Sequence, residues 1–180
     1  STRKESSAAS DVYKRQIYFS AKDGSSGTEL WAHQPGEITS LSSGSGSGSG
    51  STTTNGNGTT WQVADIYSGT GTSNPGSYMS MLVGDTLYFS ANDGSSGVEL
   101  WAHDTSNAST WQVADIRSGG GSFPGLYMEE MLVGDTLYFS ADDGSSGAEL
   151  WAHDTSNAST WRVADINLSL IHISEPTRRS

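Results

Sequence analysis

The feature that most constrains the fold is a near-exact internal repeat with a period of 50 residues. The segment 81–116 reads MLVGDTLYFSANDGSSGVELWAHDTSNASTWQVADI, and the segment 131–166 repeats it with few changes. An earlier copy begins at Ile17 with IYFSAKDGSSGTELWAH and ends at Ile66 with TWQVADI. Repetition of this kind indicates one structural unit that is built several times and stacked on itself.

Each copy predicts four short β-strands joined by tight turns. In the last copy we expect strands over 128–133, 136–141, 149–153 and 160–166, because aromatic and β-branched residues gather there between clusters of Gly, Asp and Ser. The Gly134-Asp135 pair favours a two-residue type II′ hairpin, since glycine accepts the positive φ that its first position requires. No window shows the periodicity of an amphipathic helix.

Four hairpin-linked strands in every 50 residues are typical of the blades of a β-propeller. Leu137 and Phe139 point to one side of their strand and Tyr138 to the other, as expected for a sheet that is covered on both faces. We therefore predict an all-β fragment of a β-propeller, with about three four-stranded antiparallel blades. A β-solenoid and a β-sandwich are the alternatives. Because propellers usually have ~4–8 blades, we expect further blades of the same chain beyond this sequence, and exposed faces on the terminal blades.

The predicted organisation assigns three blades and two tails. The three blades are a partial blade over 17–66 with a Ser/Gly-rich loop insertion, a blade over 67–116 and a blade over 117–167. The predicted tails are 1–16 and 168–180, and we expect both to be non-native.

We expect the tails to be non-native because the two ends of the chain are related to each other at the level of their coding sequence. One coding sequence for Asp11–Gln16, GATGTGTATAAGAGACAG, reads on the complementary strand as the code for Leu168–Ile173. The longer segments Ser6–Gln16 and Leu168–Arg178 resemble translated sequencing-adapter sequence. Segments of this origin are left out of the fold prediction.

The repeats are strongly acidic. The chain has a net charge of −11, and the segment 17–167 alone has 17 acidic and three basic residues, a net charge of −14. Such a field repels nucleic acid and anionic membrane surfaces and attracts cations. No apolar run approaches the ~20 residues that span a bilayer, so we expect no membrane insertion. The absence of cysteine excludes disulfides and cysteine-based zinc sites.

A family resemblance follows from the segments ELWAHDT at Glu149–Thr155 and LYFSADDGSSGAELW, together with the VADI segment and the SGxGSxPG linker. In this order they resemble the ELWxxDGT repeat family, which occurs in large secreted or surface proteins of microbes. The resemblance implies a propeller-like fold and an extracellular or cell-surface location, and it implies no enzymatic activity. This chain departs from the family motif at Thr155, which stands where the family has glycine.

Acidic turns are the candidate metal sites. Asn92-Asp93-Gly94 with Glu99, and the equivalent Asp142, Asp143 and Glu149, place oxygen ligands around tight loops, as calcium prefers. We expect no other cofactor. Lys22 at the equivalent position of the first copy opposes a cation, and an ordinary Asp-Gly turn is the alternative.

Other recurring polar residues are expected to be structural. His33, His103 and His153 recur once per copy beside aromatic residues. Asp65, Asp115 and Asp165 are expected to cap backbone N–H groups of the linkers between blades. The spacing around Ser90–Trp101 does not fit the Asp-box turn of sialidase propellers, and identical copies cannot supply the differing residues of an active site. We therefore expect no catalytic residues and predict that the chain is not an enzyme.

Three Asn-x-Ser/Thr triplets, at Asn57, Asn107 and Asn157, are candidate glycosylation sites on an exported protein. Together these features favour a binding or adhesion scaffold at a cell surface or outside the cell, with a protein or carbohydrate ligand and no nucleic acid. The alternatives are a purely structural spacer, a calcium-stabilised surface module and part of a propeller hydrolase.

Overall fold

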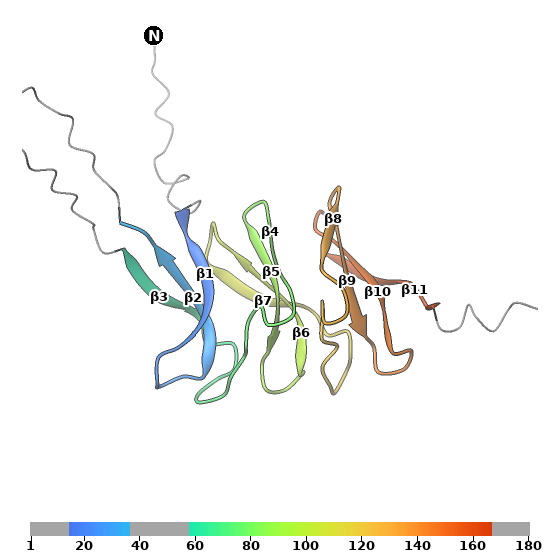
Figure 1. Cartoon of the computed structure of the whole chain (residues 1–180), viewed down its shortest axis with the longest axis horizontal. Helices are drawn as coiled ribbons and strands as arrows, with labels where there is room; N and C mark the ends of the chain where they lie inside the picture. The colour runs from blue at the N-terminus through green and yellow to red at the C-terminus, as the bar shows by residue number, and fades with distance from the viewer. Residues whose placement is uncertain (1–14, 37–57, 167–180) are drawn as a thin grey trace, which may run out of the picture.

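The computed structural model describes residues 15–36 and 58–166, which form three separate antiparallel sheets (Figure 1). The first sheet has the order β1-β2-β3. Its strands are β1 (Ile17–Lys22), β2 (Thr28–Gln34) and β3 (Thr59–Ala64). Both predicted tails and the Ser/Gly-rich insertion lie largely outside the described residues.

The second and third sheets each have four strands. The second sheet has the order β4-β5-β6-β7, formed by β4 (Ser80–Val83), β5 (Thr86–Asn92), β6 (Val98–Asp104) and β7 (Ser109–Ala114). The third has the order β8-β9-β10-β11, formed by β8 (Met131–Val133), β9 (Thr136–Asp142), β10 (Ala148–Asp154) and β11 (Ser159–Ala164). In every sheet the strands follow chain order, so each pair is a hairpin.

The predicted all-β class and the antiparallel four-stranded unit are confirmed, and the strand bounds differ most at the first strand. β8 begins at Met131, three residues later than predicted. The backbone N–H of Tyr127 donates to the Ser140 hydroxyl over 3.0 Å, so a side chain holds this approach in place of a strand ladder. Gly134 has a φ of 61°, as the predicted turn requires at its first position.

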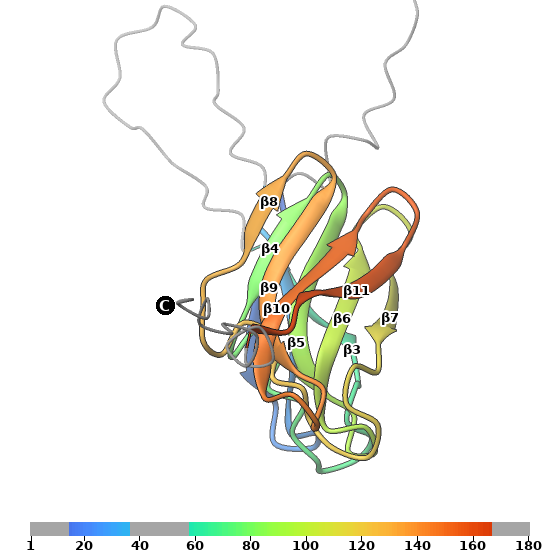
Figure 2. The ribbon, with the colours of Figure 1, turned by 90° about the vertical axis from the view of Figure 1, so that its right-hand side faces the viewer.

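The apolar core lies between the sheets, which stand side by side in Figure 1 and overlap in Figure 2. The joint between the first and second sheets buries five residues: Leu30, Ile66, Leu87, Phe89 and Ala91. The joint between the second and third sheets buries seven: Met79, Tyr88, Leu100, Ala102, Leu137, Phe139 and Ala141. Strands that are apolar on both faces thus result from a neighbouring sheet on either side.

The linkers between sheets hydrogen-bond to both of their neighbours. Ser122 donates its backbone N–H to the Val98 carbonyl over 2.9 Å, and its own carbonyl accepts the N–H of Asp142 over 2.9 Å. Ser73 bridges Thr28 and Asn92 in the same way. Each linker therefore lies between two sheets and fixes the edge of one against the other. Within the described residues there is no helix long and apolar enough to cross a membrane.

Candidate functional site

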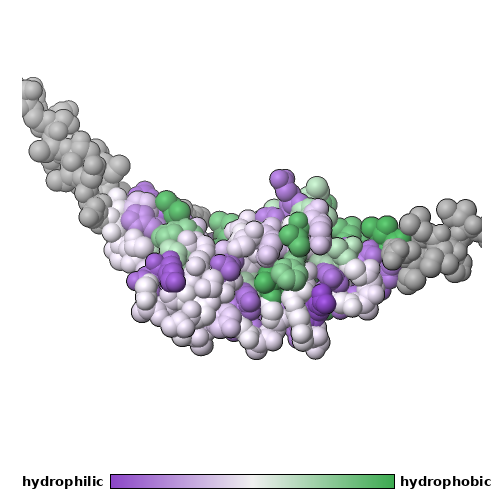
Figure 3. Space-filling view, turned by 60° about the horizontal axis from the view of Figure 1, so that its bottom comes forward, coloured by the Kyte–Doolittle hydropathy of each residue, from purple (hydrophilic) through white to green (hydrophobic). Residues whose placement is uncertain are grey.

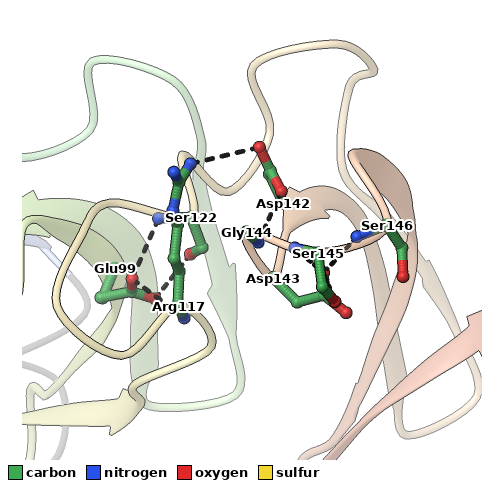
Figure 4. Close-up of polar contacts among 8 residues, drawn as sticks. All are labelled: Glu99, Arg117, Ser122, Asp142, Asp143, Gly144, Ser145 and Ser146. Carbon is green, nitrogen blue, oxygen red and sulfur yellow. Dashed lines mark hydrogen bonds and ion pairs between the residues drawn. The ribbon is translucent and has the colours of Figure 1, made fainter.

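The predicted acidic turns are closed by their own carboxylates. Asp143 Oδ1 accepts the backbone N–H groups of Ser145 and Ser146, each over 2.8 Å (Figure 4). These donors, with a smaller contribution from the Arg162 guanidinium, lower the pKa of Asp143 to about 2. Asp93 makes the same contacts in the second sheet, at 2.8 Å to the N–H of Ser95. The carboxylates therefore act as turn caps.

Asp142 lies at the end of β9 and faces the preceding linker. One of its oxygens accepts the N–H of Gly144 over 2.7 Å, and the other pairs with Arg117 Nη1 over 3.3 Å (Figure 4). Asn92 has the equivalent contact with Gly94, over 2.8 Å. The salt bridge connects the linker after the second sheet to the third sheet, and both side chains are about one third exposed, 39% and 29%.

Glu99 lies at the start of β6 with its carboxylate fully buried. Its oxygens accept the backbone N–H of Ile116 over 3.0 Å, and the N–H and hydroxyl of Ser122 over 2.9 and 2.5 Å (Figure 4 draws the Ser122 contacts). Burial raises the pKa of Glu99 to about 7, although these hydrogen bonds favour the charged form. Glu149 is also buried, and it accepts the N–H of Ile166 over 2.8 Å.

The five predicted calcium ligands thus have different structural roles. Asp93 and Asp143 close turns, Asp142 pairs with Arg117, and the two glutamates accept hydrogen bonds from the linker side of their sheets. Across residues 15–36 and 58–166, no group of three or more His, Cys, Asp or Glu side chains is placed to hold a metal ion. Of the two alternatives for these turns, the contacts favour the ordinary Asp-Gly turn, and calcium binding stays untested.

The glutamates perform the role that we expected of the VADI aspartates. The N–H of Ile116 donates to Glu99, and the N–H of Ile66 donates to Glu29 over 2.9 Å. Glu29 also accepts the hydroxyl of Ser73 over 2.7 Å. Asp165 pairs with Arg162 over 3.2 Å, and its capping of backbone N–H groups stays a prediction. The sequence signal for this capping role is a glutamate that recurs at the same position of a strand whose other residues are apolar on both faces.

The recurring histidines lie in the joints between sheets. The Nδ1 of His103 is 2.9 Å from the Thr110 hydroxyl, and the imidazole ring packs at a tilt of 54° against the Tyr18 ring of the first sheet, with 5.3 Å between the ring centroids. His153 repeats this arrangement with Thr160, at 2.8 Å, and with Tyr88, at 5.3 Å. Burial lowers the pKa of both histidines. This geometry fits the structural role that we expected.

Two of the three candidate glycosylation sites are described. Asn107 lies on the exposed turn between β6 and β7, where its amide nitrogen donates to Asp104 over 2.7 Å and its oxygen accepts the N–H of Ser109 over 2.9 Å. Asn157 has the same contacts in the third sheet, beginning with Asp154 at 2.8 Å. Asn57 lies outside the described residues. Glycosylation stays a prediction at all three.

Comparison with known proteins adds little to these contacts. Comparison with sequence models of protein families gave no match, and comparison with curated proteins gave none either. Among solved structures, the chain is similar to a puromycin hydrolase mutant complexed with PGG, at 16% sequence identity and a TM-score of 0.49. The match covers 83% of this chain and 20% of that chain, so this chain spans about a fifth of the length of that structure.

Proposed function

We propose that the chain forms three blades of a β-propeller, and that this propeller is a non-catalytic scaffold for binding or adhesion in the extracellular space or at a cell surface. One observation supports it above the others. The polar side chains that recur in each copy make the same internal contacts at both joints between sheets, as Glu29 and Glu99 do toward the linkers and His103 and His153 do toward the tyrosines.

These residues stabilise the packing of the sheets. We therefore assign ligand recognition to positions at which the copies differ. Lys22, Asn92 and Asp142 are equivalent to one another at the strand end before the acidic turn, and Tyr67 and Arg117 are equivalent in the linkers. The Tyr67 ring lies over Gly94, and Arg117 lies over Gly144 and pairs with Asp142. These two sets of variable positions lie at the same end of the sheets, and we place the surface for a protein or carbohydrate ligand there.

The composition of the sequence supports the extracellular or cell-surface location. The net charge of −14 over residues 17–167 repels nucleic acid, and the exposed Asn107 and Asn157 triplets suit an exported chain. The coding sequence on either side of this segment tests both the propeller and the location. We expect further copies of the repeat and an export signal, and a complete gene that lacks an export signal would overturn the extracellular location.

Binding itself is tested with the labelled chain on an array of immobilised glycans. We expect binding to a subset of the glycans that is weakened by the double variant Tyr67→Ala, Arg117→Ala. The matched control is Asp135→Ala, an exposed residue in the hairpin at the opposite end of the third sheet. Equal binding by the heat-unfolded chain would contradict specific recognition. Absence of binding to glycans and to surface proteins of intact cells would favour the purely structural spacer.

A further inference from the structure

We propose that Asp23-Gly24 is a site of spontaneous backbone modification, at which the aspartate is converted to isoaspartate. The equivalent pairs of the second and third sheets, Asp93-Gly94 and Asp143-Gly144, resist the same change. The difference rests on hydrogen bonds within the acidic turns, so it does not depend on the proposed ligand binding. It distinguishes one copy of the repeat from the other two at a position where all three have the same aspartate and glycine.

The reaction joins the side chain of an aspartate to the backbone nitrogen of the next residue. The nitrogen of Gly24 loses its proton and attacks Cγ of the protonated Asp23 carboxyl group. The new C–N bond closes a cyclic imide, and the hydroxyl group of the carboxyl leaves with the nitrogen's proton as water. Water then opens the imide at either carbonyl, which restores aspartate or produces isoaspartate. Glycine hinders this attack least, because no Cβ stands beside its nitrogen.

In the second and third sheets, the residue before the aspartate opposes the first step. Asn92 accepts the N–H of Gly94 on its Oδ1 over 2.8 Å. Asp142 accepts the N–H of Gly144 in the same way, over 2.7 Å (Figure 4). Such a local hydrogen bond holds the proton on the nitrogen and directs the nitrogen toward the acceptor. The negative charge of Asp142 further opposes the charge that the nitrogen would gain.

The turn of the first sheet has a lysine in place of this acceptor. Lys22 stands at the position of Asn92 and Asp142, and a lysine side chain can donate hydrogen bonds but cannot accept them. Within the part of the chain that the structure describes, the N–H of Gly24 donates to no acceptor. The positive charge of Lys22 also favours loss of a proton nearby. The cause lies in one residue of the turn itself, so it is independent of what precedes the first sheet.

The contacts of the aspartates themselves are shared by the turns and do not select between them. Asp23 Oδ1 accepts the N–H groups of Ser26 and Ser25 over 2.9 and 2.8 Å, and Asp143 has the same contacts with its own serines. These N–H groups lower the pKa of both aspartates, so the protonated form that reacts is rare. The conversion is therefore slow, and the glycine nitrogen decides where it occurs.

Conversion would alter the turn between β1 and β2. The end of the molecule that carries this turn comes forward in Figure 3, where the surface is mostly white to purple. Asp23 and Gly24 are exposed there, so the water that opens the imide can reach them. In isoaspartate the backbone runs through the former side chain, which lengthens the turn by one CH₂ group and displaces the carboxylate. Ser25 and Ser26 then lose the acceptor of their N–H groups.

The experiment incubates the full folded chain in water enriched in heavy oxygen and maps its peptides by mass spectrometry. Each passage through the imide adds one heavy oxygen atom to the aspartate that reacted, so fragmentation assigns the event to a single residue. We expect Asp23 to be labelled about tenfold faster than Asp93 or Asp143, the factor that corresponds to a hydrogen bond of ordinary net strength. The same map separates the Asn-Gly pairs within 55–58, which lie outside the described residues.

Two variants of one residue test the cause. Lys22→Asn supplies the acceptor that the second sheet has, and it should slow the labelling of Asp23 to the rate of Asp93. Lys22→Ala is the matched control: it removes the lysine without supplying an acceptor, so Asp23 should stay the fastest of the three. In urea, where the turns are lost, the three aspartates should be labelled alike. Equal labelling of the three in the folded chain would overturn the proposal, as would an unchanged rate in Lys22→Asn.

Discussion

The buried carboxylate of Glu99 accepts a hydrogen bond from the backbone N–H of Ser122 over 2.9 Å, and this contact ties the start of β6 to the linker that enters the third sheet. Glu29 makes the equivalent contact with Ser73 over 3.2 Å. In both places a strand residue reaches a linker far along the chain, and the joint between two sheets depends on that connection.

Removal of this carboxylate should destabilise the chain more than any surface change. In Glu99→Ala the backbone N–H of Ile116 and the hydroxyl of Ser122 lose their acceptor inside the protein, and a lost charged hydrogen bond with buried donors costs about 3 kcal/mol. Urea unfolding followed by tryptophan fluorescence measures the loss. The control Glu129→Ala changes an exposed glutamate and should cost less than about 0.5 kcal/mol. Equal losses for the two variants would show that the buried contacts contribute nothing.

The same carboxyl group predicts a pH dependence. Burial raises its pKa in the folded chain from 4.5 to about 7, so between these values the folded chain holds a proton that the unfolded chain has released. The contribution of Glu99 to the free energy of unfolding therefore falls as the pH rises from 4.5 to 7. We expect the stability difference between the wild type and Glu99→Gln to shift against the wild type over this range. The other titrating groups are common to both chains, and a shift in favour of the wild type would contradict the raised pKa.

Gly94 should resist substitution for two separate reasons. Its φ of 83° disfavours a side chain, and a Cβ atom there would lie 2.5 Å from the Tyr67 ring. Gly84 has a φ of 61° in the same sheet but has no atom within 4 Å of its added Cβ. Gly84→Ala should cost about 1 kcal/mol through the backbone alone, and Gly94→Ala should cost roughly 1–3 kcal/mol more through overpacking. Thermal melting of both variants gives the difference, and equal melting temperatures would show that the Tyr67 ring moves away freely.

Calcium should leave the stability of the chain unchanged. The oxygens of Asp93 and Asp143 already accept hydrogen bonds from serine N–H groups, and Asp142 pairs with Arg117. A ligand that binds only the folded state raises the melting temperature, so a melt in millimolar calcium compared with one in chelator is decisive. A rise that disappears in Asp143→Asn would show that calcium binds at this turn.

Much of the fold was predictable because each strand and turn of the repeat is determined by residues that lie close together in the sequence. Alternation of Leu137, Tyr138 and Phe139 predicted a strand covered on both sides, and Gly134 predicted the hairpin before it. The shorter β8 was not predictable, since the approach to it depends on the hydroxyl of Ser140, a residue of the next strand.

The site was harder to predict than the fold, because its contacts connect distant residues. The sequence marked Glu99 as a carboxylate near an acidic turn, which favoured a metal ligand. Its partners Ile116 and Ser122 lie in the linker beyond β7, and only the packed joint shows that they converge on it. The Asx-type turn of Asp143 involves residues two and three positions away, so the alternative of an ordinary turn was visible from the start.

The equivalence of the two internal joints has a consequence for how such a gene can change. Both joints are made from equivalent residues of the repeat. Unequal recombination that inserts or removes one whole repeat therefore leaves every remaining joint chemically unaltered. Length can then vary by single units within a population while the local stability of each unit persists. Selection would act on the differing end positions, such as Tyr67 and Arg117, without having to rebuild the interior.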